Sequence, residues 1–246
     1  MAAPAKPQGR KGPLQVTGGN PTWAVIKFPA SKPDRERLIA DMFVNASSHR
    51  IDQESAEVPS YRPFSIVCQN DEDDLDFTIN TGRGERKLEL VEFAPLADYG
   101  RSFSTLPLQV DQATKAASLV GLIQKKSLHQ GGPDTMLLVY VTEEAFRLDP
   151  ITIEIARRSL GKDPPKFERV YYVSPHDAST GSADEIYPGK PHHMCGGWTD
   201  ERLAHTRAKF FHPTEFVHVS EFPMVMWLEH YEVRTMKVRI LTPAAW

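Results

Sequence analysis

The sequence has few cysteines and no long apolar run. Only Cys68 and Cys195 occur among its 246 residues, so we expect no disulfide framework and infer a reducing compartment such as the cytoplasm. No stretch approaches the roughly eighteen consecutive apolar residues of a membrane-spanning helix, and we therefore expect no membrane as a partner. Residues 1–13 also lack the apolar segment of a secretory signal.

Several common catalytic motifs are missing as well. The sequence contains no G-x-S-x-G, no G-x-x-x-x-G-K-[ST] and no G-x-G-x-x-G. Ser174, His176 and Asp177 lie close together in the sequence, but this cluster is typical of a turn and not of a catalytic triad. These absences disfavour a serine hydrolase, a P-loop nucleotide-binding protein and a dinucleotide-dependent oxidoreductase.

The charge is nearly balanced, with a formal net charge of −3 and an isoelectric point of about 6.3. Strong binding of nucleic acid usually draws on an excess of Lys and Arg, although a local basic patch can be sufficient. The length and the 40% share of hydrophobic residues allow one large domain, with or without an appendage. We expect a disordered basic arm at 1–22, an α/β core at 23–188, and an extension of that domain or a small appendage at 189–246.

Apolar periodicity predicts alternating helices and strands. Strands are expected at 23–28, 64–69, 75–80, 87–93, 136–141 and 167–173, and helices at 31–46, 109–129 and 151–160. A short helix at 199–210 and strands at 216–219 and 233–241 are expected near the C-terminus. The apolar run at 136–141 is typical of a strand buried on both faces. The pattern predicts an α/β fold in which helices flank a central mixed sheet.

Two acidic residues mark the hairpin that the pattern predicts in this core. If the hairpin closes symmetrically about Gly82–Glu85, Asp76 lies opposite Val91 and becomes a diagonal neighbour of Glu89 on the same face. The two carboxylates can then converge on one cation, and Mg²⁺ or Mn²⁺ suits a site made of carboxylates, water and phosphate. A slip of one residue would bring Glu92 to this face in place of Glu89, so that alternative stays open.

The neighbouring helices provide two further candidates. Glu36 shares a face with Ile39 and Phe43, where a carboxylate is costly unless it is paired or bound to a metal; alternatively, it lies at the solvated edge of that face. Lys126 follows Ile123 by three residues and continues the core-facing stripe of its helix. There it can position a water or stabilise charge on a phosphate. The alternative for Lys126 is a solvated lysine near a helix C-terminus.

Together these residues resemble the PD-(D/E)xK, or restriction-endonuclease-like, nuclease superfamily. The resemblance rests on LDF (75–77), a short turn, LELV (88–91), a helix ending in IQKK (123–126), and the buried strand after it. The order of elements over roughly residues 31–142 is similar to that of the family. The resemblance implies a restriction-endonuclease-like sandwich, Asp76 and Glu89 as the motif acids that bind Mg or Mn, and hydrolysis of a phosphodiester in nucleic acid.

The sequence departs from the family pattern at two positions. Leu75 stands where a proline is usual, and Val91 stands where the family's lysine usually follows the glutamate. Some branches of the superfamily carry that lysine on the following helix, and there Lys126 would take its part. Without such a lysine, the resemblance implies an inactive nuclease fold that serves as a binding or assembly module, with a protein partner or a second copy of the chain.

A separate group of histidines and a cysteine near the C-terminus suggests zinc. Its members are His192, His193, Cys195, His205 and His212. Their spacing matches no standard zinc pattern, and surface histidines are the alternative explanation.

Overall fold

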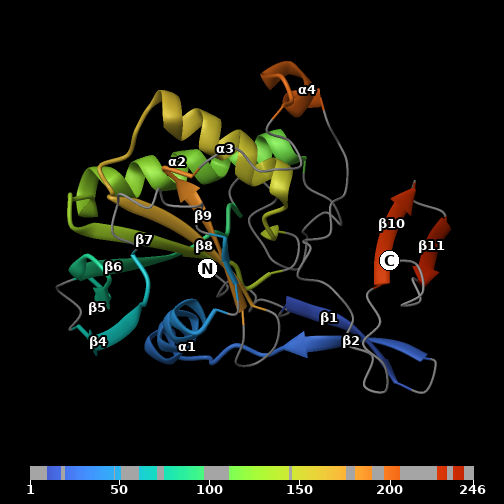
Figure 1. Cartoon of the computed structure of the whole chain (residues 1–246), viewed down its shortest axis with the longest axis horizontal. Coiled ribbons are helices and arrows are strands. Elements are labelled where there is room, and N and C mark those ends of the chain that lie inside the picture. The colour runs from blue at the N-terminus through green and yellow to red at the C-terminus, as the bar shows by residue number, and fades with distance from the viewer. Residues whose placement is uncertain are drawn as a thin grey trace, which may run out of the picture.

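A computed structural model describes most of the chain (Figure 1). The described residues are 10–17, 20–46, 48–50, 61–70, 75–96, 111–143, 146–175, 181–189, 197–205, 226–231 and 235–240. Side chains are described within 27–46, 61–70, 75–96, 111–143, 146–175, 181–189 and 197–203. The expected strand at 216–219 lies outside the described residues. Among the described residues, no helix has the length and apolar character needed to cross a membrane.

A seven-stranded mixed sheet forms the centre of the described structure. Its strands are β3 (Ser48–Arg50), β4 (Ser65–Gln69), β5 (Phe77–Thr81), β6 (Gly84–Glu92), β7 (Thr135–Tyr140), β8 (Arg169–Pro175) and β9 (Gly181–Tyr187). Their order across the sheet is β3-β9-β8-β7-β6-β5-β4. Strands β6, β7 and β8 run parallel, β3 is parallel to β9, and the other pairs are antiparallel. The expected α/β fold with a central mixed sheet is therefore confirmed.

Helices cover both faces of this sheet. Helix α1 (Lys32–Val44) lies on one face, whereas α2 (Gln112–Gln130) and α3 (Pro150–Lys162) lie together on the other (Figure 1). Short helix α4 (Asp200–His205) packs on α3 through Leu203. The three long helices start where the sequence offers a cap, since Ser31, Asp111 and Asp149 each accept a hydrogen bond from a backbone N–H of the first turn.

Alternating side chains along the strands divide the core into two layers. On β6, Leu88 and Leu90 pack with α1, whereas Val91 and Phe93 just beyond belong to the layer under α2 and α3. All six residues of β7 are buried, as expected for a central strand covered on both faces. Glu89 has the same parity as Val91 and is thereby directed to the α2 side of the sheet.

Two further hairpins lie outside the central sheet. Strand β1 (Arg10–Thr17) pairs with β2 (Asn20–Ile26), and β10 (Met226–Tyr231) pairs with β11 (Thr235–Ile240), both antiparallel. Strand β1 falls within the arm expected to be disordered at 1–22. Apolar residues alternate with polar ones in its second half, a pattern that permits pairing despite the Gly and Pro of the segment.

The hairpin of β5 and β6 has a different register from the expected one. Thr81 pairs with Gly84 across a two-residue loop, and Phe77 pairs with Leu88, so the expected pairing of Asp76 with Val91 is wrong by two residues. The threonine side chain tightens the loop by accepting from Arg83 N at 3.1 Å. Gly84 has a φ of 96°, a conformation that glycine adopts without steric cost. A shift of two residues leaves every side chain on its expected face.

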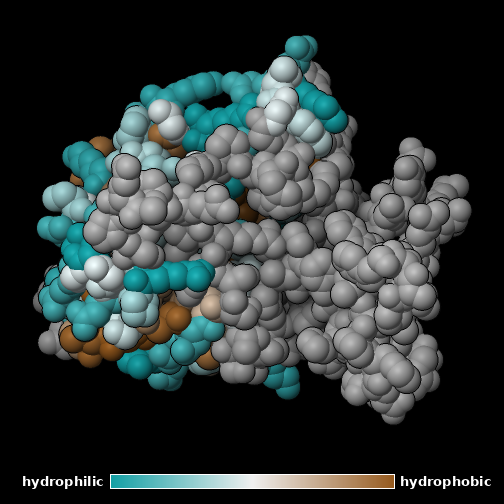
Figure 2. Space-filling model, viewed as in Figure 1, coloured by the Kyte–Doolittle hydropathy of each residue, from teal (hydrophilic) through white to brown (hydrophobic). Residues whose placement is uncertain are grey.

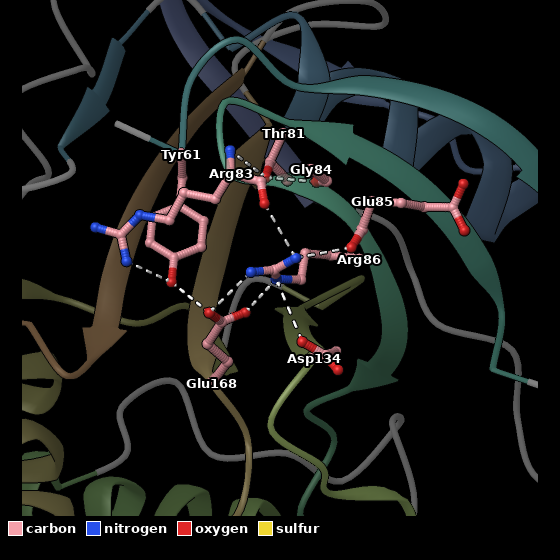
Figure 3. Close-up of polar contacts among 8 residues, drawn as sticks. All are labelled: Tyr61, Thr81, Arg83, Gly84, Glu85, Arg86, Asp134 and Glu168. Atoms are coloured by element: carbon pink, nitrogen blue, oxygen red, sulfur yellow. Dashed lines mark hydrogen bonds and ion pairs between the residues drawn. The ribbon is translucent and has the colours of Figure 1, made fainter. Parts of the chain in front are cut away.

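A network of charged side chains and one tyrosine ties this hairpin to β8 (Figure 3). Glu168, immediately before β8, accepts from Tyr61 Oη at 2.5 Å and from Arg86 Nε at 2.6 Å. The guanidinium carbons of Arg83 and Arg169 lie 4.0 and 4.5 Å from the centroid of the Tyr61 ring. These contacts fix the hairpin that carries the two candidate acids.

Most of the coloured surface in Figure 2 is polar, with an apolar patch where Figure 1 places β4 and α1. Strand β4 is an edge of the sheet, and its Val67 is half exposed.

Candidate functional site

The site forms where β5 and β6 stop pairing. Their ladder ends at Phe77 and Leu88, and Asp76 is the residue immediately before it. The Oδ2 atom of Asp76 accepts a hydrogen bond from Leu90 N at 2.6 Å. A carboxylate therefore occupies the place that a backbone carbonyl of β5 would take, while β6 continues alongside β7. This end of the hairpin is thus open to side chains from both helical layers.

Glu89 is the second acid of the site and is almost completely buried, with 3% of its surface exposed. Its Oε1 atom lies 2.6 Å from Lys126 Nζ, so it is ion-paired to α2. Burial raises the pKa of Glu89, the hydrogen bond from Lys126 opposes this, and the charge and hydrogen bond of Asp76 raise it further. Since Asp76 also accepts from the backbone of Leu90, the residue after Glu89, the two carboxyl groups are neighbours at this end of the hairpin.

Helix α1 reaches the same acids from the other face of the sheet. Glu36 is buried, and its Oε1 atom lies 3.3 Å from Lys32 Nζ. Burial and, next, the charge of Asp76 raise the pKa of Glu36. Burial alone would lower the pKa of Lys32, but Glu36, Asp76 and Glu89 together raise it. Three carboxylates and two ammonium groups thus interact at this end of the hairpin.

The open choice between Glu89 and Glu92 is decided by their surroundings. Glu92 has the opposite parity and accepts a hydrogen bond from Thr142 Oγ1. It lies opposite Tyr140 in the parallel ladder. Burial of Tyr140 raises the pKa of that tyrosine most, and the charge of Glu92 raises it further. Glu89 is the residue placed beside Asp76, as expected.

Asp76, Glu89 and Lys126 lie together at this point, and Glu36 interacts with Asp76 through its charge. The sequence interpretation overlooked two other residues. Lys32 lies one helical turn before Glu36. Gln130 lies one turn after Lys126 and accepts from its Nζ at 2.8 Å. Residues four apart on a helix face the same way, and that spacing was the signal in the sequence that could have identified both.

The donor set fits a hard divalent cation. Asp76 and Glu89 offer carboxylate oxygens, the ligands that Mg²⁺ prefers, and their mutual repulsion would fall on binding a positive ion. Among the residues described, no three His, Cys, Asp or Glu side chains are arranged to hold a metal. Mg²⁺ held by one or two carboxylates takes its remaining ligands from water and substrate oxygens.

The side chains proposed as zinc ligands near the C-terminus are not described. His192, His193, Cys195 and His212 are not among the described residues, and of His205 only the backbone, in α4, is described.

The Glu36→Gln variant is expected to be more stable than the wild type at pH 7, with a melting temperature higher by about 2–4 °C. The folded pKa of Glu36 is raised above 4.5, so its proton stabilises the fold fully below pH 4.5. That stabilisation is lost as the pH rises through the folded pKa. Its partner Lys32 is 70% exposed, so the ion pair adds little in return.

Thermal denaturation between pH 4 and pH 8 would test this expectation, with the exposed Glu85 replaced by Gln as the matched control. The increase in melting temperature caused by Glu36→Gln should become smaller toward pH 4, and Glu85→Gln should cause no increase. A lower melting temperature for Glu36→Gln at pH 7 would contradict the assignment of a destabilising charge to Glu36.

Comparisons with protein-family models, with curated proteins and with solved structures found no match to this chain.

Proposed function

We propose that the protein is a metal-dependent phosphodiesterase of the PD-(D/E)xK type that cleaves nucleic acid. The observation that carries the proposal is the meeting of Asp76, Glu89 and Lys126, from the two arms of the hairpin and a helix, at the point where the β5–β6 ladder ends. The mixed sheet between α1 and the α2–α3 layer is compatible with the restriction-endonuclease-like sandwich. In this proposal Lys126 takes the part of the lysine that is missing at Val91.

Each residue has a distinct part in the proposed reaction. Asp76 and Glu89 would hold Mg²⁺ or Mn²⁺, and the bound ion would supply activation of a water and stabilisation of negative charge on the leaving oxygen. The ammonium of Lys126 holds a water in line or neutralises charge that builds on the phosphate. Glu36 adds negative charge from α1 and orients water at the site. Its Oε1 atom lies 3.3 Å from Lys32 Nζ.

The second candidate is a catalytically inactive protein of the same fold that binds or assembles with a partner. Two observations favour it. Lys126 already neutralises Glu89 at 2.6 Å, and Val91 leaves β6 without the usual lysine. In this case nucleic acid, another protein or a second copy of the chain would be the partner, and the acids would have no turnover to support.

A cleavage assay separates the two candidates. Single- and double-stranded DNA and RNA are incubated with the purified chain in Mg²⁺, in Mn²⁺ and in excess EDTA. The proposal predicts cleavage of at least one substrate in a divalent ion and none in EDTA. Absence of cleavage under all conditions, or equal cleavage in EDTA, would overturn the proposed activity. The inactive binding or assembly protein would then be the remaining candidate.

Lys32 is expected to contact substrate phosphate from the α1 side. Its long, largely exposed side chain is held near the acids by Glu36. Lys32→Met should raise KM by about threefold to tenfold and lessen the salt dependence of KM, with little change in kcat. Steady-state kinetics at two salt concentrations would measure this, with the exposed Lys125→Met as control. Equal KM values in both variants would contradict the contact.

A further inference from the structure

Gln130, the last residue of α2, contacts the site through Lys126. Its Oε1 atom accepts a hydrogen bond from Lys126 Nζ at 2.8 Å, and the same Nζ lies 2.6 Å from Glu89 Oε1. The ammonium is therefore held from two directions, by strand β6 and by its own helix. The side chain of Lys126 is 30% exposed, so part of it is in contact with solvent.

The two acceptors differ in what happens to them in the proposed reaction. A divalent cation at Asp76 and Glu89 would draw on the lone pairs of Glu89 and weaken its hold on Lys126. Gln130 is neutral, so it can keep the ammonium in place without adding a third negative charge or competing for the cation. An ammonium has three protons, and these two contacts leave one for water or substrate.

We propose that Gln130 is a positioning residue that keeps the ammonium of Lys126 at the acid pair. It acts through Lys126 and does not itself touch the reacting atoms. Its effect on cleavage rests on the proposed function, whereas its hold on Lys126 stands on the geometry alone.

An ordinary pair on a helix surface is the alternative explanation for the contact. Side chains four residues apart on a helix stabilise it by only about 0.2–0.5 kcal/mol, so a stability measurement would not separate the two. The helix supplies a matched control. Gln124 lies on a different side of α2, and its Nε2 atom donates to Asp163 O at 2.6 Å, away from the acids.

Acetylation of lysines tests the hold on Lys126 directly. Limiting acetic anhydride is applied to the wild type and to Gln130→Leu, Gln130→Glu and Gln124→Leu, and the rates at Lys126 and Lys125 are measured by peptide mass spectrometry. Gln130→Leu should speed acetylation of Lys126 by about 1.4-fold to 2.3-fold, the factor that loss of such a contact implies. Lys125 should not change, Gln124→Leu should match the wild type, and Gln130→Glu, which keeps an acceptor, should restore protection.

Cleavage kinetics then distinguish positioning from a purely structural contact. In Gln130→Leu, kcat should fall by about tenfold with KM within about twofold of the wild type, because a displaced catalytic group loses rate and not binding. An unchanged rate of Lys126 acetylation in Gln130→Leu would overturn the proposal, and so would an unchanged kcat. If the wild type cleaves nothing, the proposed activity fails, and the acetylation result alone decides the role of Gln130.

Discussion

Replacing Asp76 with asparagine is expected to lower cleavage in Mg²⁺ or Mn²⁺ by at least about a hundredfold. The substitution removes one of the two charges that would bind the ion. It keeps an oxygen that can accept the 2.6 Å hydrogen bond from Leu90 N, so the strand end should remain in place. Steady-state cleavage rates over a range of divalent ion concentrations would measure the loss.

Asp41→Asn is the matched control for this loss. Asp41 lies on α1 and pairs with Arg37 at 3.1 Å, with both side chains well exposed, so its charge should not matter to the site. Glu89→Gln should behave like Asp76→Asn. Wild-type cleavage by Asp76→Asn, in protein with a wild-type melting temperature, would remove Asp76 from the mechanism.

Removing the carboxylate of Glu168 should produce the largest loss of stability among these variants, about 2–3 kcal/mol for Glu168→Ala. Glu168 accepts from Arg86 and Tyr61, and the side chains of Glu168 and Arg86 are only 20% and 16% exposed (Figure 3). Without Glu168 the Arg86 guanidinium keeps only Asp134, at 4.0 Å, as a carboxylate partner among the described residues. Urea denaturation of the variant and the wild type would give the difference.

A double-mutant cycle shows whether that loss comes from the ion pair. Arg86→Ala alone and together with Glu168→Ala should reveal a coupling energy of about 1 kcal/mol or more. The exposed pair of Arg37 and Asp41 should give a coupling below about 1 kcal/mol in the same assay. Equal coupling energies for the two pairs would mean that the network contributes no more than a surface ion pair.

The sequence was sufficient to predict the elements whose signals are local. Helix α1 begins with a serine cap and a proline in its first turn, and β7 is an unbroken apolar run, so both were placed within about two residues. The parity of Asp76 and Glu89 was also predictable, because a strand alternates strictly and the error in register was an even number of residues.

Features that depend on distant parts of the chain could not be predicted in this way. Strand β9 contains the buried residues Asp184 and Glu185, and such a polar sequence does not predict a strand. Glu185 is tolerated there because it pairs with Arg169 of the neighbouring strand β8. The contact between Tyr61 and Glu168 spans more than a hundred residues and has no local signature. The β5–β6 ladder ends at the site because the side chain of Asp76 takes the place of a backbone partner for Leu90 N.

Binding of Mn²⁺ tests the central claim most directly, because it does not require the right nucleic acid to be found. Isothermal titration calorimetry would be done with the wild type, Asp76→Asn and Asp41→Asn. Binding by the wild type and by Asp41→Asn, with loss of that binding in Asp76→Asn, is the predicted result. No binding by the wild type, or equal binding by all three proteins, would contradict a cation site at Asp76 and Glu89.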